Sequence, residues 1–358
     1  MKLVVLGLSL SSSWGNGHAT TYRALLKAFA ARGHEVLFLE RDVPWYAKQR
    51  DLADPDWCSL CFYADLDDLA RFTPEIAEAD AVIVGSYVPD GVAVAHFVQE
   101  TAGLTAFYDI DTPVTLAKLA RGDFEYLSPE LVPSYDLYLS FTGGPTLARI
   151  EREYGSPAAR ALYCSVDADA YRPADVPKRW DLSYLGTYSP DRQPTLGRLL
   201  LEPARAHPHR RFVVAGPQYP GDIEWPDNVE RIDHLPPSEH AAFYSASRWT
   251  LNVTRADMTA AGWSPSVRLF EAAACGTPII SDVWDGLDTL FEPGREIILA
   301  HRGGDVTAAL DDADASALGK AARARALAAH TATHRAAELE RHLLEAATLR
   351  RPADVEVA

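Results

Sequence analysis

The segment Gly262–Asp282, GWSPSVRLFEAAACGTPIISD, holds the residues whose types and spacing point most directly to chemistry. Ser264 suits a helix N-cap and Pro265 the first helical position, so we expect a helix that runs to about Ala274. The N–H groups at such a helix start carry positive partial charge and suit a diphosphate. Glu271 lies six residues inside, about 9 Å along the axis at ~1.5 Å per residue. Its carboxylate is therefore placed to accept hydrogen bonds from ribose hydroxyls. An ordinary capped helix, with an Arg268–Glu271 pair at i, i+3, explains the same residues equally well.

Basic side chains follow strand-like segments in the same half of the chain. Arg192 comes after LGTYSP and Arg255 after TLNVT. Positive charge there would stabilise a diphosphate leaving group as its bond to a sugar breaks. Each arginine by itself also fits a solvated surface charge, because arginine is mostly exposed. The expected nucleotide-binding residues are Tyr188, Arg192, Arg255, Ser264, Ser266, Val267, Arg268 and Glu271, with Ser189 as a further donor.

A second candidate site lies in the first half of the chain. The stretch Ser11–Thr20, SSSWGNGHAT, joins a strand-like run to a helical one, and Gly15, Asn16 and Gly17 form an expected acceptor or phosphate loop. Glycines let the backbone pass close to a ligand, and the helix start again suits phosphate. His18 stands at that helix start. It is either a catalytic residue or a histidine that packs and hydrogen-bonds at the turn.

Two acids follow another strand-like run, in FYDIDTPVT. Asp109 or Asp111 can take a proton from an acceptor hydroxyl if its pKa lies near the working pH. Either can instead bind sugar hydroxyls, and Asp111 can cap the helix that begins at the DTP sequence. Whether Asp109 faces a ligand or the sheet stays open. The expected catalytic residues are His18, Asp109 and Asp111.

Short apolar runs that alternate with helical stretches indicate buried parallel strands. In the first half they are Leu3–Leu8, Val36–Leu39, Ala81–Val84, Leu104–Tyr108 and Leu137–Leu139. In the second half they are Leu182–Leu185, Phe212–Ala215, Val229–Ile232, Thr250–Val253 and Pro278–Ser281. A chain of 358 residues corresponds to about two domains at roughly 150 residues each. We therefore expect an α/β protein with two doubly wound Rossmann-like domains that face each other across a ligand cleft.

Helical periodicity and linker composition place the boundaries. Between Ala19 and Ala31 the apolar residues fall on one helix face, and Gly33 suits a C-terminal cap. Proline and charge concentrate in Tyr171–Lys178, YRPADVPK, which predicts a linker. The expected divisions are residues 1–172, 178–320 and a helical tail over 321–358.

Composition excludes several classes of protein. Fifty acidic against 34 basic residues give a formal charge of -16, which disfavours binding to nucleic acid or to anionic membranes. No apolar run approaches the ~18–20 residues that span a bilayer. The N-terminal MKLVVLGLSLSSS resembles a signal peptide but continues into a helix and a second strand, which favours a first strand. Four cysteines, with an isolated CxxC at Cys58 and Cys61, suit a reducing cytoplasm.

The motifs also resemble a known family. EAAACGTPIISD is similar to the donor-site signature of GT-B glycosyltransferases, and RGHEV (Arg32–Val36) resembles the start of their second strand. Further stretches resemble the CgeB-like (spore maturation protein) branch, and the motifs keep their order along nearly the whole chain. They are Asp181–Pro194, Val214–Pro220, Thr250–Arg255, Ser264–Gly276 and Pro293–Ile297.

The resemblance implies a metal-independent transfer of sugar from a nucleotide-diphosphate sugar to an acceptor hydroxyl. It implies a ribose contact for Glu271, an acceptor-side N-terminal domain near His18, and a tail helix that crosses back to that domain. No cofactor is expected; the donor is a UDP-sugar first, with GDP- or dTDP-sugars as alternatives. The acceptor is a small molecule, a glycan or a lipid-linked compound. Trp263 stands eight positions before Glu271, where many retaining relatives carry a second glutamate that touches the donor sugar.

The sequence leaves three other functions open. A nucleotide-sugar epimerase or hydrolase would share the fold and the ribose-binding glutamate. A non-catalytic nucleotide-sugar-binding module would bind the donor without turnover. An NAD(P)-dependent oxidoreductase is suggested by Gly15-x-Gly17 and by Glu40 at the end of a strand. That fingerprint is incomplete, because Ser9–Trp14 separates Leu8 from Gly15 and Thr20 replaces the third glycine.

Overall fold

The computed structural model describes residues 1–14, 17–311 and 315–350. It divides into an N-terminal unit, Met1–Tyr163 with the segment from Thr333 onward, and a C-terminal unit, Cys164–Ala332. The first boundary therefore falls before the expected linker. Tyr171–Lys178 belongs to the C-terminal unit because Tyr171 is buried there, and Ala174 and Lys178 donate hydrogen bonds to Ser245 and Ser247.

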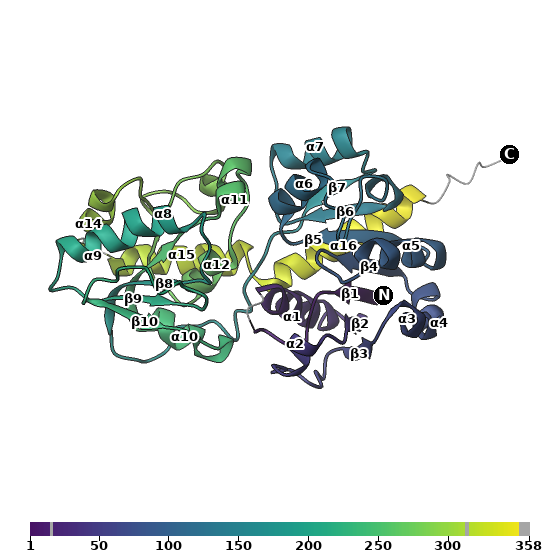
Figure 1. The fold of residues 1–358 in the computed structure, drawn as a ribbon, viewed down its shortest axis with the longest axis horizontal. Helices are drawn as coiled ribbons and strands as arrows, with labels where there is room; N and C mark the ends of the chain where they lie inside the picture. Colours follow the sequence, from purple (N-terminus) through teal and green to yellow (C-terminus); the bar gives the residue numbers. More distant parts are fainter. Residues whose placement is uncertain (15–16, 312–314, 351–358) are drawn as a thin grey trace. The chain divides into compact units, whose positions relative to one another are not determined.

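The N-terminal unit is built on a seven-stranded parallel sheet in the order β3-β2-β1-β4-β5-β6-β7 (Figure 1). Its strands are β1 (Lys2–Gly7), β2 (Glu35–Arg41), β3 (Ser59–Tyr63), β4 (Ala81–Gly85), β5 (Thr105–Asp109), β6 (Leu137–Ser140) and β7 (Ala159–Ala161). Strands β1, β4 and β5 are almost wholly buried, as expected for strands covered on both faces. Strands β3 and β7, at the two edges of the sheet, were not predicted.

Helices connect these strands: α1 (Gly17–Ala30), α2 (Pro44–Ala47), α3 (Leu66–Leu69), α4 (Thr73–Ala77), α5 (Gly91–Thr101), α6 (Thr112–Ala120) and α7 (Pro145–Tyr154). Helix α1 forms where predicted because Tyr22, Leu25 and Phe29 bury one face. Gly33, with φ of 89°, follows its end as the expected cap.

The C-terminal unit repeats the architecture with a six-stranded parallel sheet in the order β10-β9-β8-β11-β12-β13. Its strands are β8 (Trp180–Leu185), β9 (Phe212–Ala215), β10 (Val229–Ile232), β11 (Ser247–Asn252), β12 (Ile279–Ser281) and β13 (Ile298–Leu299). Five of these match predicted strands, and β13 at the sheet edge does not. In both sheets the strand order reverses beside the first strand, at β1/β4 and β8/β11. Ligands of such sheets bind at the carboxyl ends of the strands at this point.

The helices of the C-terminal unit include α10 (Pro237–Ser245), α11 (Ala256–Ala261), α12 (Val267–Ala274), α13 (Leu287–Leu290) and α14 (Gly303–Asp311). The predicted helix near Pro194–His207 forms as α8 (Gln193–Leu196), a π-turn over Gly197–Leu201 and α9 (Glu202–Ala206). Of the tail, α15 (Ala315–Ala329) lies in the C-terminal unit, and α16 (Ala332–Arg350) lies in the N-terminal unit (Figure 1). The N-terminal unit thus resumes at Thr333, whereas the sequence analysis placed the start of the tail at residue 321. No helix in the described ranges is long and apolar enough to span a membrane.

Candidate functional site

Helix α12 begins two residues later than the sequence suggested. Its N-cap is Ser266, whose extended backbone precedes Val267, whereas Ser264 and Pro265 lie buried in the preceding loop. The Ser266 hydroxyl does not cap the helix, because it donates to Oδ1 of Asn252 at the end of β11, 2.8 Å away. The helix start is therefore fixed to the sheet, and its first amide groups stay uncapped by the Ser266 side chain.

Arg268 links α12 to the end of β8. Its Nε donates to the carbonyl of Leu185 at 2.5 Å, and its Nη1 donates to Asn252 Oδ1 at 2.9 Å. The guanidinium also lies over the ring of Tyr184, 4.8 Å from its centroid. A Cβ on Gly186 would approach Nη2 of Arg268 to 2.7 Å, so a larger residue there would displace the guanidinium. Arg268 therefore does not form the suggested pair with Glu271, and its hydrogen bonds hold the loop after β8.

Glu271 is buried, with 3% of its surface exposed, and faces α10. The Tyr244 hydroxyl donates to its Oε2 at 3.2 Å, and His240 Nδ1 lies 4.0 Å from the same oxygen. The Tyr171 hydroxyl lies 3.1 Å from His240 Nδ1. Burial, together with the Glu271 charge, raises the pKa of both Tyr171 and Tyr244 well above the usual value of a phenol. Both phenols therefore remain protonated around a carboxylate fixed in one orientation.

The loops after β8 and β11 are joined by Asp191. Its carboxylate accepts hydrogen bonds from the Ser189 hydroxyl and, at 2.8 Å, from the Ala256 N–H, and lies 4.0 Å from Arg255 Nε. Burial opposes its ionisation, but these hydrogen bonds and the charges of Arg255 and Arg192 bring the pKa of Asp191 below its usual value. A fixed anion thus lies beside Arg255 and within electrostatic reach of Arg192, the two strand-end arginines that the sequence singled out.

One hydrogen-bond donor of Arg192, its Nε, is not used within the described residues. Its Nη2 donates to the Thr187 carbonyl at 2.9 Å, but its buried Nε has no hydrogen-bond partner among the described residues. A buried donor without a partner costs free energy unless a ligand or water satisfies it. Tyr188, in the same loop, packs edge-on against Tyr219, with ring centroids 5.5 Å apart. The predicted residues Tyr188, Arg192 and Arg255 therefore gather where the strand order of this sheet reverses.

In the N-terminal unit, the structure brings His18 and Asp111 together. His18 Nε2 lies 4.0 Å from Asp111 Oδ2, and the Tyr87 hydroxyl donates to the same oxygen at 3.2 Å. Asp111 occupies the N-cap position of α6, but its side chain makes no cap hydrogen bond. Tyr87 was not predicted. Its φ of 63° is rare for a bulky residue, and such strain occurs at functional positions.

Asp109 does not face a ligand. The side chain is fully buried and accepts hydrogen bonds from the Tyr138 hydroxyl at 2.5 Å and the Thr115 hydroxyl at 2.7 Å. Burial raises the pKa of Asp109 to about 6, although those hydrogen bonds favour the charged form. Residue 109 is the last of β5 and its side chain points into the core, so of the two orientations left open by the sequence Asp109 adopts the one that faces the sheet; its catalytic role stays a prediction.

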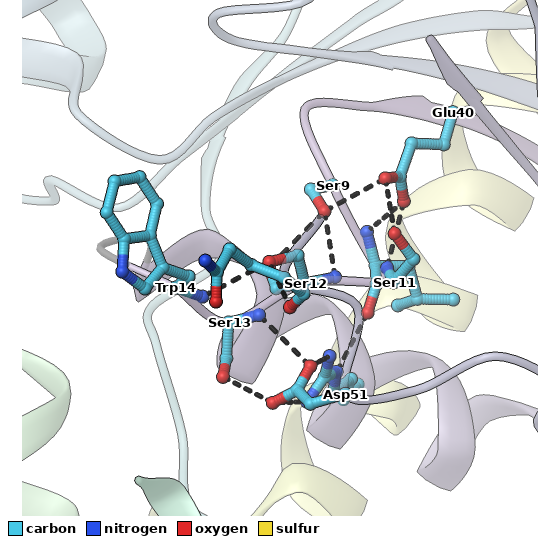
Figure 2. Close-up of polar contacts among 10 residues, drawn as sticks. Ser9, Ser11, Ser12, Ser13, Trp14, Glu40 and Asp51 are labelled. Carbon is cyan, nitrogen blue, oxygen red and sulfur yellow. Dashed lines mark hydrogen bonds and ion pairs between the residues drawn. The ribbon is translucent and has the colours of Figure 1, made fainter. Parts of the chain in front are cut away.

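The glycine loop is described only in part. Gly15 and Asn16 lie outside the described residues, and Gly17 is the exposed first residue of α1. Glu40, the acid that suggested a dinucleotide fingerprint, is fully buried (Figure 2). It accepts hydrogen bonds from the Leu10 and Ser11 amides at 2.7 and 2.9 Å, and from the Ser9 and Ser11 hydroxyls. A carboxylate enclosed in this way cannot bind a ribose, which removes the basis for an oxidoreductase.

Other chemistry suggested by residue type finds little support in the described ranges. They contain no group of three or more histidine, cysteine, aspartate or glutamate side chains arranged to hold a metal ion. Cys58, Cys61 and Cys275 are free thiols, and the Cys164 thiol donates to the Pro265 carbonyl at 3.4 Å. Burial raises the pKa of Cys58 and of Cys275 to about 12, so both are inert thiols at neutral pH.

Comparison with known proteins adds to this geometry. Residues 192–341 match the family described as glycosyl transferase-like. This match spans Arg192, Arg255 and Glu271, but not Tyr188. No curated protein matches the chain by sequence.

Solved structures resemble the chain over almost its full length. Sucrose-phosphate synthase from Thermosynechococcus elongatus is 16% identical, with a TM-score of 0.70 over 98% of this chain and 100% of that one. HepE from Anabaena, in complex with UDP-glucose, is 12% identical, with a TM-score of 0.68 over 96% and 100%. The E. coli trehalose-6-phosphate protein bound with UDP-2-fluoro glucose is 12% identical, with a TM-score of 0.65 over 96% and 99%. The fold is GT-B. At these identities the likeness establishes the fold alone.

Proposed function

We propose that this protein is a glycosyltransferase that moves a sugar from a nucleotide-diphosphate sugar to an acceptor hydroxyl. The observation that carries the proposal is the Glu271 carboxylate, which Tyr244 orients inside a helix whose start is fixed by Ser266. In this proposal the ribose hydroxyls donate to Glu271, and the diphosphate rests against the first amides of α12. The match to a glycosyl transferase-like family over residues 192–341 supports the same assignment.

The leaving diphosphate would be neutralised by Arg192 and Arg255. Both follow strand ends in the C-terminal unit, and the buried Nε of Arg192 has a donor to offer. Fixed cationic donors stabilise charge that develops in the transition state, because they need no reorganisation when the bond breaks. Arg268 would act differently. Its hydrogen bonds to Leu185 and Asn252 make it a positioning residue for the phosphate-facing loops.

The acceptor side would lie in the N-terminal unit, at His18 and Asp111. Tyr87 and His18 both contact Asp111, whose Oδ2 is the shared point of the cluster. In an inverting reaction either His18 or Asp111 would take the proton of the acceptor hydroxyl. In a retaining reaction by front-face attack they would only position the acceptor. Asp109 would support the cluster without contact to substrate, since its carboxylate accepts a hydrogen bond from the Asp111 N–H.

The CgeB-like motifs favour that branch of the fold, and the UDP-sugars bound to two structural neighbours favour a UDP-sugar, hence a hexosyl transfer. We propose that the reaction needs no metal ion, since arginines are available for the diphosphate. The free thiols of Cys58, Cys61 and Cys275 favour a cytoplasmic location.

A thermal-shift screen with UDP, GDP, dTDP and CDP tests the donor site. A ligand that binds only the folded protein raises the melting temperature more the tighter it binds, so the largest rise names the nucleotide. Replacement of Glu271 by alanine should weaken that nucleotide by about 1–3 kcal/mol through loss of charged hydrogen bonds. Glu202→Ala, on an exposed position of α9, is the matched control. Unchanged affinity of the Glu271 variant would reject the ribose contact.

Turnover assays with the matching nucleotide sugar separate the remaining functions. Release of nucleoside diphosphate that depends on an added acceptor supports transfer. Acceptor-independent turnover would indicate an epimerase or hydrolase. Donor binding without turnover across a broad acceptor set would indicate a binding module.

A further inference from the structure

Two tryptophans of the N-terminal unit stand in solvent after adjacent strands. Trp14 follows β1 and is 48% exposed, and Trp45 lies on α2 after β2 and is 56% exposed. Tryptophan is strongly buried on average, so two exposed indoles on neighbouring segments are a feature to explain. We call the segments Ser9–Trp14 and Glu40–Asp51, which carry them, the indole platform.

Hydrogen bonds make the indole platform one rigid piece. Besides the Glu40 contacts, the Ser12 hydroxyl donates to the Gln49 carbonyl at 2.9 Å, and the Ser13 hydroxyl donates to Asp51 at 2.5 Å. The N–H groups of Asp51 and Leu52 both donate hydrogen bonds to the Ser11 carbonyl, each at 3.0 Å. Figure 2 shows these bonds converging on the serines while the Trp14 ring points away from them. The polar groups thus bind each other, and the indole is left for a partner.

The charges of the platform argue for a neutral partner. Segment Glu40–Asp51 holds three acids and three bases. The arginines are paired: Arg41 with Asp90 at 2.8 Å and Arg50 with Asp42 at 2.7 Å, while Asp51 is held by Arg23. A surface for anionic lipid would show an excess of basic residues beside its tryptophans. This balance disfavours phosphates and anionic membranes.

We propose that the indole platform binds the sugar ring of a carbohydrate acceptor by stacking. One face of a pyranose ring is lined by C–H groups while its hydroxyls point outward, so a flat indole covers that face and leaves the hydroxyls to polar neighbours. Aromatic rings on a rigid support provide contact area at low entropic cost. The proposal rests on the proposed function and narrows its acceptor to a glycan. Its placement agrees, because α1 begins three residues after Trp14 and carries His18 beside Asp111.

Binding to defined glycans tests the proposal without knowledge of the reaction. The full-length protein, with UDP present, is applied to immobilised oligosaccharides ending in glucose, galactose, mannose, N-acetylglucosamine or rhamnose, and separately to phosphatidylcholine vesicles with and without phosphatidylglycerol. The expected result is glycan binding that Trp14→Ala/Trp45→Ala weakens about tenfold or more, a typical loss for central aromatic contacts. Trp14→Phe/Trp45→Phe should keep part of the affinity. Leu344→Ala, which removes an exposed apolar side chain from α16, should keep all of it.

Three outcomes would overturn the inference: binding to none of the glycans, glycan binding equal in the wild type and the double alanine variant, or tryptophan-dependent binding to vesicles instead. Thermal shifts with UDP, GDP, dTDP and CDP, recorded on the same samples, separate this result from the proposed function. Nucleotide binding without glycan binding rejects the platform alone. Glycan binding without nucleotide binding rejects the glycosyltransferase and leaves a carbohydrate-binding surface.

Discussion

The hydroxyl of Tyr244 donates a hydrogen bond of 3.2 Å to the carboxylate of Glu271, and the two side chains belong to different helices of the C-terminal unit. Tyr244 is fully buried on α10, so its phenol has little freedom to move. Glu271 is thereby held in one rotamer before any ligand arrives. A preorganised acceptor loses less entropy on binding a ribose than a mobile one would.

Tyr244→Phe should therefore weaken nucleotide binding while the fold is kept. Loss of this orienting hydrogen bond, with the contacts between Glu271 and ribose kept, predicts a loss of about 1 kcal/mol in affinity for the preferred nucleoside diphosphate. Calorimetric titration measures it. Tyr135→Phe is the matched control, because it removes a buried phenol oxygen that has no hydrogen-bond partner among the described residues. Equal affinities in both variants would show that Tyr244 does not position Glu271.

Arginines 192 and 255 should matter for the diphosphate rather than for the nucleoside. Arg192→Ala and Arg255→Ala should each reduce affinity for UDP by about 1–3 kcal/mol, the range for hydrogen bonds to charged groups, and leave the weak binding of uridine unchanged. Arg198→Ala, at an exposed position of the helical segment that follows Arg192, should change neither. A parallel loss of uridine binding would mean that the arginines shape the nucleoside pocket or the fold instead.

Much of the fold follows from the sequence because parallel strands in such sheets are continuous apolar runs. Strands β9 and β10 coincide with the predicted ranges, and the central strands β1, β4, β8 and β11 differ from them by a few residues at their ends. The edge strands β3, β7 and β13 escaped prediction. They are short and half exposed, so their apolar content is diluted and tertiary pairing rather than composition makes them strands.

The candidate site was predicted only as far as local patterns reach. The sequence located Arg192, Arg255 and Glu271, since each follows a strand end or a helix start. It could not separate Asp109 from Asp111, because the direction of a side chain at a strand end depends on register and on the following turn. Tyr244, His240 and Tyr87 were missed for another reason. Their contacts join segments far apart in the chain, and only the packed structure brings them together.

Asp111→Asn should affect the acceptor and spare the donor. An amide keeps the size of the side chain but removes the charge that can accept a proton or hold an acceptor hydroxyl. The expected result is a fall in kcat/KM for the acceptor of about 100-fold or more, with unchanged affinity for the nucleoside diphosphate. Asp123→Asn, which alters an acid paired with Lys118 after α6, is the control. If Asp111→Asn also weakened nucleoside-diphosphate binding to a similar extent, Asp111 would have a structural role instead.

Chelation tests whether the arginines are sufficient for the diphosphate. Transfer activity should survive EDTA, and added Mg²⁺ or Mn²⁺ should change the rate by less than about twofold, since fixed cationic donors already supply the stabilisation that a metal would. The test compares steady-state transfer rates before EDTA is added, after it is added, and after Mg²⁺ or Mn²⁺ is added back. Loss of activity in EDTA with recovery in magnesium would contradict the metal-independent mechanism.

The raised pKa of Asp109 predicts that the folded protein becomes less stable as the pH rises. Its pKa of about 6 in the folded protein lies above the usual value of 3.8. Between those values the folded state holds a proton that the unfolded state has lost. The stabilising contribution is therefore complete below about pH 4 and is lost as pH rises through 6. The difference between the two pKa values corresponds to a decrease in the free energy of unfolding on the order of 3 kcal/mol as the pH rises through this range.

Asp109→Asn removes this titration, so its melting temperature should rise relative to that of the wild type as the pH is raised from 4 to 7. Asp51→Asn should run nearly parallel to the wild type over this range, because Arg23 and Ser13 overcome the effect of burial and hold the pKa of Asp51 below its usual value of 3.8. The stabilising contribution of Asp51 is therefore present above about pH 4 and is lost only as the pH falls below it. Calorimetric melting curves at each pH measure both differences. Parallel curves for the wild type and Asp109→Asn across this range would show that the buried carboxyl does not titrate there.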